Sequence, residues 1–218
     1  TLKFSEIFGF GAGGMFTYGF QLMITGYYLM YYMTDIAGFS TVVAASLYST
    51  IQVIKMVTML FSGVIIDAIN FKSGKYRTWT LVAGIGLGLF FPLSFFYYPL
   101  PQATYAVVFM IVYTLQTLFY NVGWTSMRAM IGKISKNKAD VVALNTSAQS
   151  AGTISSILYG YIGYPILGIA LWAGTKQAYG CASAIYGLTI ILGAIFLYCK
   201  FGKYEHEADT AVPIKKER

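Results

Sequence analysis

Polar side chains recur at helical spacing inside apolar segments of this sequence, and their types could bind a small solute. Nearly all of them fall three or four residues apart, so each set lies along one side of a helix. The sets are Thr17, Gln21, Thr25, Tyr28 and Tyr32; Tyr48, Gln52, Lys55, Thr58 and Ser62; Tyr113, Gln116, Tyr120, Asn121 and Trp124; and Asn145, Gln149, Thr153 and Ser156. Amides, hydroxyls and aromatic faces together suit a pocket for a small polar solute. For any single Ser or Thr, a hydrogen bond between helices is the alternative.

Lys55 is the most informative of these residues, because it lies about a dozen residues from either end of its apolar segment. A charged side chain at the centre of a membrane helix costs about 2.5–3.5 kcal/mol on insertion scales. Such residues usually face a bundle interior or a water cavity and mark a substrate or ion pathway. An ion pair is the structural alternative, but Asp35 and Asp67 lie at segment ends and no apolar segment holds a well-buried acid. We therefore expect Lys55 to have a functional role.

The composition indicates that these residues are carried by membrane helices. The chain has 218 residues, of which 57% are hydrophobic and 11% charged. A soluble globular domain has about 25% charged residues, so a soluble fold is excluded. A helix that spans a bilayer needs about 20 mostly apolar residues. Six segments qualify, at about 9–33, 42–66, 79–97, 104–126, 142–168 and 178–199.

The expected fold is all-α and integral to the membrane. Residues 1–200 would form a six-helix transmembrane bundle in the lipid bilayer, and residues 201–218 a polar cytoplasmic tail or the start of a central loop. The fifth span is the most polar, because its first half would fail a strict hydropathy criterion and would have to face protein or water. Long apolar runs disfavour a β-barrel, whose strands alternate.

The positive charge is concentrated in segments that would share one side of the membrane. Thirteen of the 15 Lys and Arg residues belong to the N-terminal segment, the loops at 67–78 and 128–140, and the tail. This distribution places Arg128 in the second of these loops. Basic loops favour the cytoplasmic side, so we expect both termini there, in a bacterial inner membrane. Because topology accounts for the charge, no nucleic acid is expected as a partner.

Three features are typical of an enzyme or of a bound cofactor, but their positions in the sequence argue against both. Residues 9–14 match G-x-G-x-x-G, but they open an apolar helix, whereas a dinucleotide site needs a preceding strand. The one histidine, His206, lies in the tail. Cys181 and Cys199 would lie about 27 Å apart on one helix, beyond disulfide reach. We therefore expect neither an enzyme nor a bound cofactor or metal.

Three stretches carry longer motifs in order along the chain. Residues 63–79 contain G-x-x-x-D followed by Gly-Lys-Tyr-Arg-x-Trp. Residues 31–40 read Tyr-Tyr-Met-Thr-Asp-Ile-Ala-Gly-Phe-Ser. Residues 120–124 read Tyr-Asn-Val-Gly-Trp. Together they resemble the glycoside–pentoside–hexuronide:cation symporters of the major facilitator superfamily, which include the melibiose carrier. The resemblance implies a conformational loop formed by Gly63, Asp67, Gly74, Lys75 and Arg77.

The resemblance implies a transporter built from two six-helix halves. This chain would be the N-terminal half, a fragment whose partner is the second half, although a half-sized member is the alternative. It would move a small polar solute, a sugar or glycoside, by alternating access around a site between spans one, two, four and five. A membrane sensor or scaffold with the same fold is the alternative function. The substrate-binding residues expected from the polar faces and the resemblance are Gln21, Thr25, Gln52, Lys55, Asn121, Trp124, Asn145 and Gln149.

The sequence departs from the family at positions that matter for coupling. Lys55 and Met59 stand where the family has acidic cation-site residues, so sodium coupling is not expected. The helix-one acid is also missing, Asn121 replaces a charged sugar ligand, and an arginine expected near residues 148–149 is absent. Coupling would then involve Lys55 with Thr58. Lys55 would act either as a proton switch or as a permanent substitute for the cation, and the residues leave both open.

Overall fold

The computed structural model describes residues 2–19, 28–170, 172, 174 and 176–210, and within these ranges it contains helices and no strand. The helices follow one another along the chain with short connections. In order they are α1 (Phe4–Gly14), η1 (Met15–Gly19), α3 (Leu29–Tyr31), η3 (Tyr32–Ile36), α4 (Thr41–Ala68), α5 (Lys75–Phe95), α6 (Gln102–Ile134), α7 (Lys138–Ala170) and α8 (Ala178–Thr210). The segments η1 and η3 are π-helical. The all-α prediction is confirmed.

Helices occupy all six predicted spans, and four of the described helices are long and apolar enough to cross a membrane, namely α4, α5, α6 and α8. The polar helix α7 is not among them, as its hydropathy predicts. The first span is divided between α1 with η1 and α3 with η3, and residues 20–27 lie outside the described residues. The helices of the later spans extend beyond the predicted ends. As a result Arg128 and Lys133 lie on α6, and the prediction that placed them in a loop is wrong.

Local sequence signals explain several helix ends. Ser40 caps α4, because its side chain accepts a hydrogen bond from the Val43 amide at 3.4 Å. Gly38 has φ of +75°, a conformation that L side chains rarely adopt, and it lies in the turn before that cap. Gly74 has φ of +105° directly before α5, and Pro101 precedes α6. These residues separate the long helices into distinct spans.

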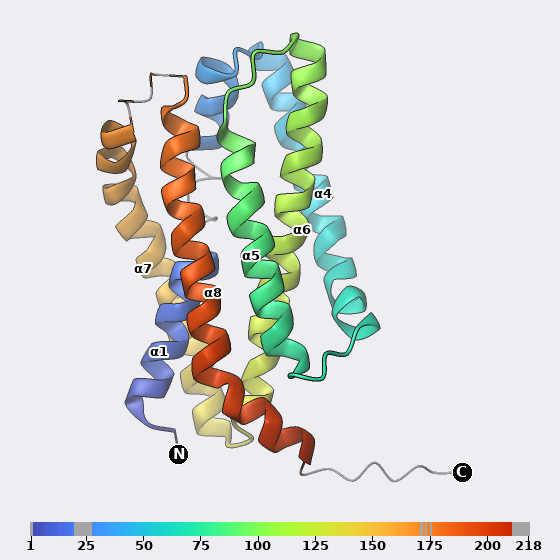
Figure 1. Ribbon diagram of the computed structural model, residues 1–218, viewed down its shortest axis with the longest axis vertical. Helices are drawn as coiled ribbons and strands as arrows, with labels where there is room; N and C mark the ends of the chain where they lie inside the picture. The colour runs from blue at the N-terminus through green and yellow to red at the C-terminus, as the bar shows by residue number, and fades with distance from the viewer. Residues whose placement is uncertain (1, 20–27, 171, 173, 175, 211–218) are drawn as a thin grey trace.

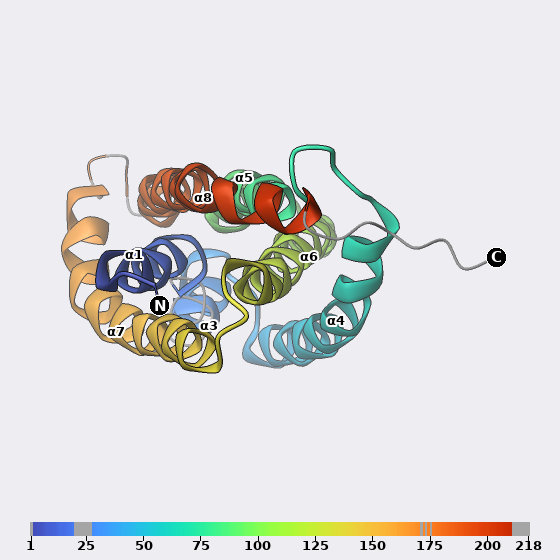
Figure 2. The same cartoon turned by 90° about the horizontal axis from the view of Figure 1, so that it is seen from below.

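The helices form a bundle in which α8 and α5 lie side by side along one side (Figures 1 and 2). Helices α7 and α4 lie at the two ends of the opposite side, and α1, α3 and α6 lie in the middle of the bundle, as Figure 2 shows. Helix α4 packs mainly against α6, and α1 packs against α7. Most of α4 is exposed, including large apolar side chains such as Leu60 and Val64. The opposite pair, α5 with α8, is held much more closely.

Glycines let the backbones of α5 and α8 approach each other. A Cβ atom added to Gly187 would lie 2.4 Å from the carbonyl oxygen of Gly88. A Cβ atom added to Gly84 would lie 2.3 Å from the Cβ atom of Ala194. Small residues at such contacts are typical of membrane helix pairs, which gain stability from close van der Waals packing.

Gly187→Ala is therefore expected to lower the free energy of unfolding by about 1–3 kcal/mol, because the added methyl group would have to displace backbone atoms of α5. Thermal unfolding in detergent measures the change. Gly132→Ala is the matched control, since a Cβ atom there would meet no atom within 4 Å. Equal melting temperatures for the two variants would contradict the close contact.

The beginning of α1, the connections α4–α5 and α6–α7, and the end of α8 lie at one end of the bundle (Figure 1). Lys203 on α8 donates to Glu6 Oε1 on α1 at 2.8 Å, and Tyr204 donates to the same oxygen at 2.5 Å. These hydrogen bonds lower the pKa of the Glu6 carboxyl to about 2, so the stability they add is lost only as the pH falls from 4.5 towards 2. The predicted boundary at residue 200 lies within α8, where Phe201 is buried against Phe10.

Candidate functional site

The polar face of α4 meets α6 at the centre of both helices. Asn121 Nδ2 donates to the carbonyl oxygen of Lys55 at 3.0 Å and to Thr58 Oγ1 at 2.7 Å. One turn further along, Ser62 and Thr125 form a hydroxyl–hydroxyl hydrogen bond of 3.0 Å. The structure therefore brings Lys55, Thr58 and Asn121 together. Asn121 Nδ2 makes both of these hydrogen bonds to α4, and its carbonyl oxygen takes no part in them.

The ammonium group of Lys55 has no carboxylate partner among the side chains that the structure describes. Lys55 is half-buried near the middle of α4, and Gln52, one turn before it, is exposed. A cation at this depth without a described counter-ion is typical of a functional position, because an isolated charge in a membrane helix is costly. Met59, which follows one turn later, is 61% exposed and offers no hard oxygen ligand.

An aromatic wall lies on α6 beside this contact. The rings of Tyr120 and Trp124 are nearly parallel, with centroids 6.4 Å apart, and Tyr18 of η1 meets both rings edge-on. The Tyr18 hydroxyl donates to the carbonyl oxygen of Thr80 on α5 at 2.9 Å, which fixes its ring. Trp124 is half-buried, so part of its ring remains accessible. Such a wall can stack on the apolar face of a sugar ring.

Arg128 continues this wall toward α7. Its Cζ atom lies 4.6 Å from the centroid of the Trp124 ring, and its Nη2 atom donates to Gln149 Oε1 at 2.9 Å. A guanidinium group therefore lies beside the position on α7 where the resemblance implies an arginine. The sequence reasoning missed Arg128 because it ended the fourth span too early. Its spacing of four and seven residues from Trp124 and Asn121 was the available signal.

The predicted site residues that remain are Asn145, Gln21 and Thr25. Asn145 donates to the Val141 carbonyl oxygen of its own helix at 2.9 Å, so its amide group is partly used there. Gln21 and Thr25 lie outside the described residues. Gln116, which shares the predicted polar face of α6, is fully buried, and neither its amide nitrogen nor its oxygen has a hydrogen-bond partner within the described part of the chain. Buried polar groups are nearly always paired, so an unpaired amide in a membrane helix indicates a role beyond packing.

The predicted conformational loop is organised by charge. Lys75 donates to Asp67 at 2.6 Å across the α4–α5 turn. The amides of Tyr76 and Arg77 donate to the carboxylate of Glu205, which caps the beginning of α5 from α8. No role was predicted for Glu205, because a single acid in a polar tail carries no sequence signal.

Of the other predicted loop residues, Gly74 and Arg77 lie at the same turn. Gly74 must lack a side chain, because a Cβ atom there would lie 2.7 Å from Glu205. Arg77 donates from Nε to the Ser73 carbonyl oxygen. Gly63 lies further back on α4, and a Cβ atom there would have nothing within 4 Å.

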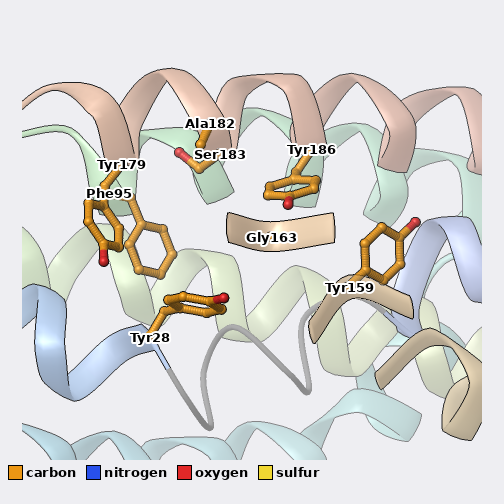
Figure 3. Close-up of a pocket in the computed structure, with 8 residues that line it drawn as sticks. All are labelled: Tyr28, Phe95, Tyr159, Gly163, Tyr179, Ala182, Ser183 and Tyr186. Atoms are coloured by element: carbon orange, nitrogen blue, oxygen red, sulfur yellow. The ribbon is translucent and has the colours of Figure 1, made fainter. Parts of the chain in front are cut away.

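A separate aromatic pocket lies where α7 meets the first turns of α8, near the end of α5 (Figure 3). Figure 3 shows tyrosine rings around Gly163, with Tyr186 above it, Tyr28 below it, and Tyr179 and Tyr159 on its two sides. Its lining residues are Tyr28, Phe95, Tyr159, Gly163, Tyr179, Ala182, Ser183 and Tyr186. Most of the lining surface belongs to the faces of aromatic rings, and the hydroxyl groups of four tyrosines and of Ser183 belong to the same residues.

Comparison with known proteins identifies the family. The family described as MFS/sugar transport protein matches residues 9–217. The chain belongs to this family. Membership of the MFS/sugar transport proteins confirms the predicted resemblance and agrees with the helical bundle. It also confirms that the chain is not an enzyme, because the family and its relatives are named as transporters.

Three curated relatives of this MFS/sugar transport protein are similar over most of its length. YagG of Escherichia coli (strain K12), named for glycoside/cation symport, is 26% identical over 99% of this chain and 47% of its own length. The isoprimeverose transporter of Lactiplantibacillus pentosus is 23% identical over 90% of this chain and 41% of its own. The inner membrane symporter YicJ of Escherichia coli (strain K12) is 22% identical over 80% of this chain and 37% of its own length. The chain thus spans less than half the length of these relatives.

Proposed function

We propose that this chain is the N-terminal half of a secondary-active or facilitative transporter that moves a sugar or glycoside across the membrane by alternating access. One observation carries the proposal: polar side chains in the middle of the spans lie on the exposed surface of α4 and α7. Gln52 on α4 and Gln149 on α7 are both exposed. Amides cannot face lipid without cost, so this surface suits a water-filled cavity. The names of the relatives support a sugar or glycoside as the solute.

The second half of the same transporter is the partner that would close this cavity. The relatives are more than twice as long as the matched region, which leaves room for six further helices. Helices α4 and α7, which carry the exposed Gln52 and Gln149, both lie on the side of the bundle opposite α5 and α8 (Figure 2). In folds of this kind the solute site lies near the membrane midplane, and the two halves rock around it. The site would therefore include Lys55, Asn121, Trp124 and Gln149 from this half.

The proposed mechanism does not use sodium at this site. A sodium ion needs hard oxygen ligands, and the α4 positions facing this region hold the ammonium of Lys55 and the thioether of Met59. Lys55 with Thr58 would take part in coupling. It would act either as a group that changes its protonation or as a fixed positive charge that takes the place of the ion.

Uptake and binding measured on the same full-length protein test the proposed function. Radiolabelled glycosides or pentosides are offered to vesicles that contain the protein, and binding is measured in parallel on purified protein in detergent. Entry of the solute into the vesicle lumen supports a transporter. Binding without entry would instead identify a sensor or scaffold. Absence of both for every sugar offered would contradict the proposal.

The bundle is expected to place both termini and the two basic connections in the cytoplasm. Single cysteines at exposed positions test this in a background that lacks Cys181 and Cys199. Asn70→Cys lies in the α4–α5 connection, and Ala103→Cys lies at the start of α6. An impermeant thiol reagent applied to intact cells should label the cysteine at position 103 and leave the one at position 70 unlabelled. The reverse pattern would show that the orientation is inverted.

A further inference from the structure

An open groove lies between the first span and α8, where α1 and η1 pack against that helix. Its volume is about 360 Å³, within the range of about 300–1,000 Å³ that ligand sites occupy. The groove is lined by Ala12, Gly13, Phe16, Thr189, Leu192, Gly193 and Phe196. The one hydroxyl among these side chains, that of Thr189, donates to the Tyr186 carbonyl oxygen of its own helix at 2.8 Å. The groove therefore offers a hydrocarbon surface.

Small residues form the floor of the groove and large apolar residues form its walls. A Cβ atom added to Gly13 would lie 2.5 Å from the Leu197 side chain, so the backbone itself lines the floor there. Along the first span, exposed phenylalanines recur every four residues at positions 4, 8 and 16, and Ala12 stands in the gap of this row. Phe16 on one side and Leu192 on the other are exposed and border the gap.

Lys200 closes one end of the groove. It follows Phe196 by one turn of α8, and its Nζ atom lies 5.1 Å from the centroid of that ring. The ammonium reaches across to α1, where it donates to the Ser5 carbonyl oxygen at 3.1 Å and lies where a Cβ atom of Gly9 would be. No carboxylate accepts from it within the described part of the chain. An ammonium has three donors, so two remain for an anion at this end.

The length of the groove matches one leaflet of a bilayer. Thr189 and Lys200 are eleven residues apart, which is about 16 Å along an α-helix. This is about half of the hydrocarbon core of about 30 Å. The Lys200 end is also the end of the bundle that we expect at the cytoplasmic surface, where anionic lipids attract basic residues. A free anion would occupy only the ammonium and leave the apolar walls uncovered, whereas a phospholipid has a group for each part.

We propose that this groove binds an anionic phospholipid of the leaflet at the Lys200 end. One acyl chain lies between Phe16 and Leu192, and the phosphate accepts hydrogen bonds from Lys200. This lipid site is separate from the proposed solute site on α4, α6 and α7. The inference depends on the membrane bundle and not on the identity of the solute.

The test measures lipid binding to the full-length protein in detergent by native mass spectrometry. Palmitoyl-oleoyl phosphatidylglycerol is compared with palmitoyl-oleoyl phosphatidylcholine, which has the same chains but no net charge. Lys200→Gln removes the cation, and Lys136→Gln is its control at an exposed position in the connection after α6. Ala12→Leu fills the groove, and Ala184→Leu is its control, because Ala184 is also half-buried but lies outside the lining. Melting temperatures in lipid-free detergent show whether each variant is folded.

The wild type is expected to bind phosphatidylglycerol about fivefold or more tightly than phosphatidylcholine, as one basic residue at a membrane surface provides. Lys200→Gln should bring this ratio close to one, and Ala12→Leu should weaken the binding of both lipids by about tenfold. Both control variants should behave as the wild type. Equal binding of the two lipids by the wild type would overturn the inference, and so would an unchanged ratio in folded Lys200→Gln.

Two further measurements locate the lipid and identify the part of it that binds. Phosphatidylglycerol with a photoreactive diazirine in one chain should label peptides that contain Phe16 or Leu192, and labelling confined to other helices would contradict the site. Glycerol 3-phosphate, which carries a phosphate without the chains, should not displace the lipid at equal concentration. Displacement would assign Lys200 to a free phosphate and overturn the lipid site.

Discussion

Uptake by the full-length protein is expected to continue when choline replaces Na⁺ at constant pH, and Lys55→Met is expected to reduce it by about tenfold or more. Lys55 is half-buried in the middle of α4, and its ammonium has no carboxylate partner within the described part of the chain. A positive charge there would repel a bound sodium ion. Hydrogen bonds to a charged group are worth about 1.5–3 kcal/mol, and 1.4 kcal/mol corresponds to a factor of ten.

Lys72→Met is the matched control, because Lys72 is exposed in the α4–α5 connection. Initial rates of uptake into vesicles, with the amount of inserted protein measured in each preparation, separate transport from expression. Loss of uptake in choline would mean that the ion binds at another position. Wild-type uptake by Lys55→Met would show that this lysine is tolerated without a role.

Asn121→Leu is expected to weaken solute binding by about tenfold and to lower the melting temperature as well. In the structure the nitrogen of this side chain donates to α4 at Lys55 and Thr58, and under the proposed function its oxygen would accept from the solute. Leaving a buried neutral partner unpaired costs about 1–3 kcal/mol. Interhelical hydrogen bonds average only about 0.6 kcal/mol, so the loss of stability should be the smaller effect.

Solute binding to the purified full-length variant and its thermal unfolding in detergent measure the two effects separately. Asn70→Leu makes the same replacement at an exposed position outside the bundle and serves as the control. If Asn121→Leu binds the solute as tightly as the wild type, Asn121 belongs to the helix contact alone.

The spans could be predicted from the sequence because a bilayer imposes a length and a composition on each helix. The helix ends could not, because helices extend beyond the hydrocarbon into water, where hydropathy no longer marks them. Arg128 shows the consequence. Its charge ended the predicted fourth span, whereas α6 continues to Ile134 and carries the arginine into the bundle.

Helical spacing predicted which side chains share a face but not which partner each would choose. The spacing correctly grouped Lys55 with Thr58, and the structure adds that Asn121 contacts both. It could not show that Asn145 would donate to its own helix, since a local carbonyl competes with more distant partners. The role of Glu205 at the start of α5 depends on a contact across 129 residues, which no local pattern contains.

The contact between α1 and α8 has a consequence for biogenesis. Glu6 and Lys203 are 197 residues apart, so the first helix meets this partner only when the sixth span has been made. At synthesis rates of about 5–20 residues per second, α1 waits about 10–40 s after its own synthesis. Until then the glycines of α1 that meet α8, Gly9 and Gly13, must be shielded by the insertion machinery or by lipid. Once α8 arrives, the described bundle can close on itself before any later segment of a longer chain enters the membrane.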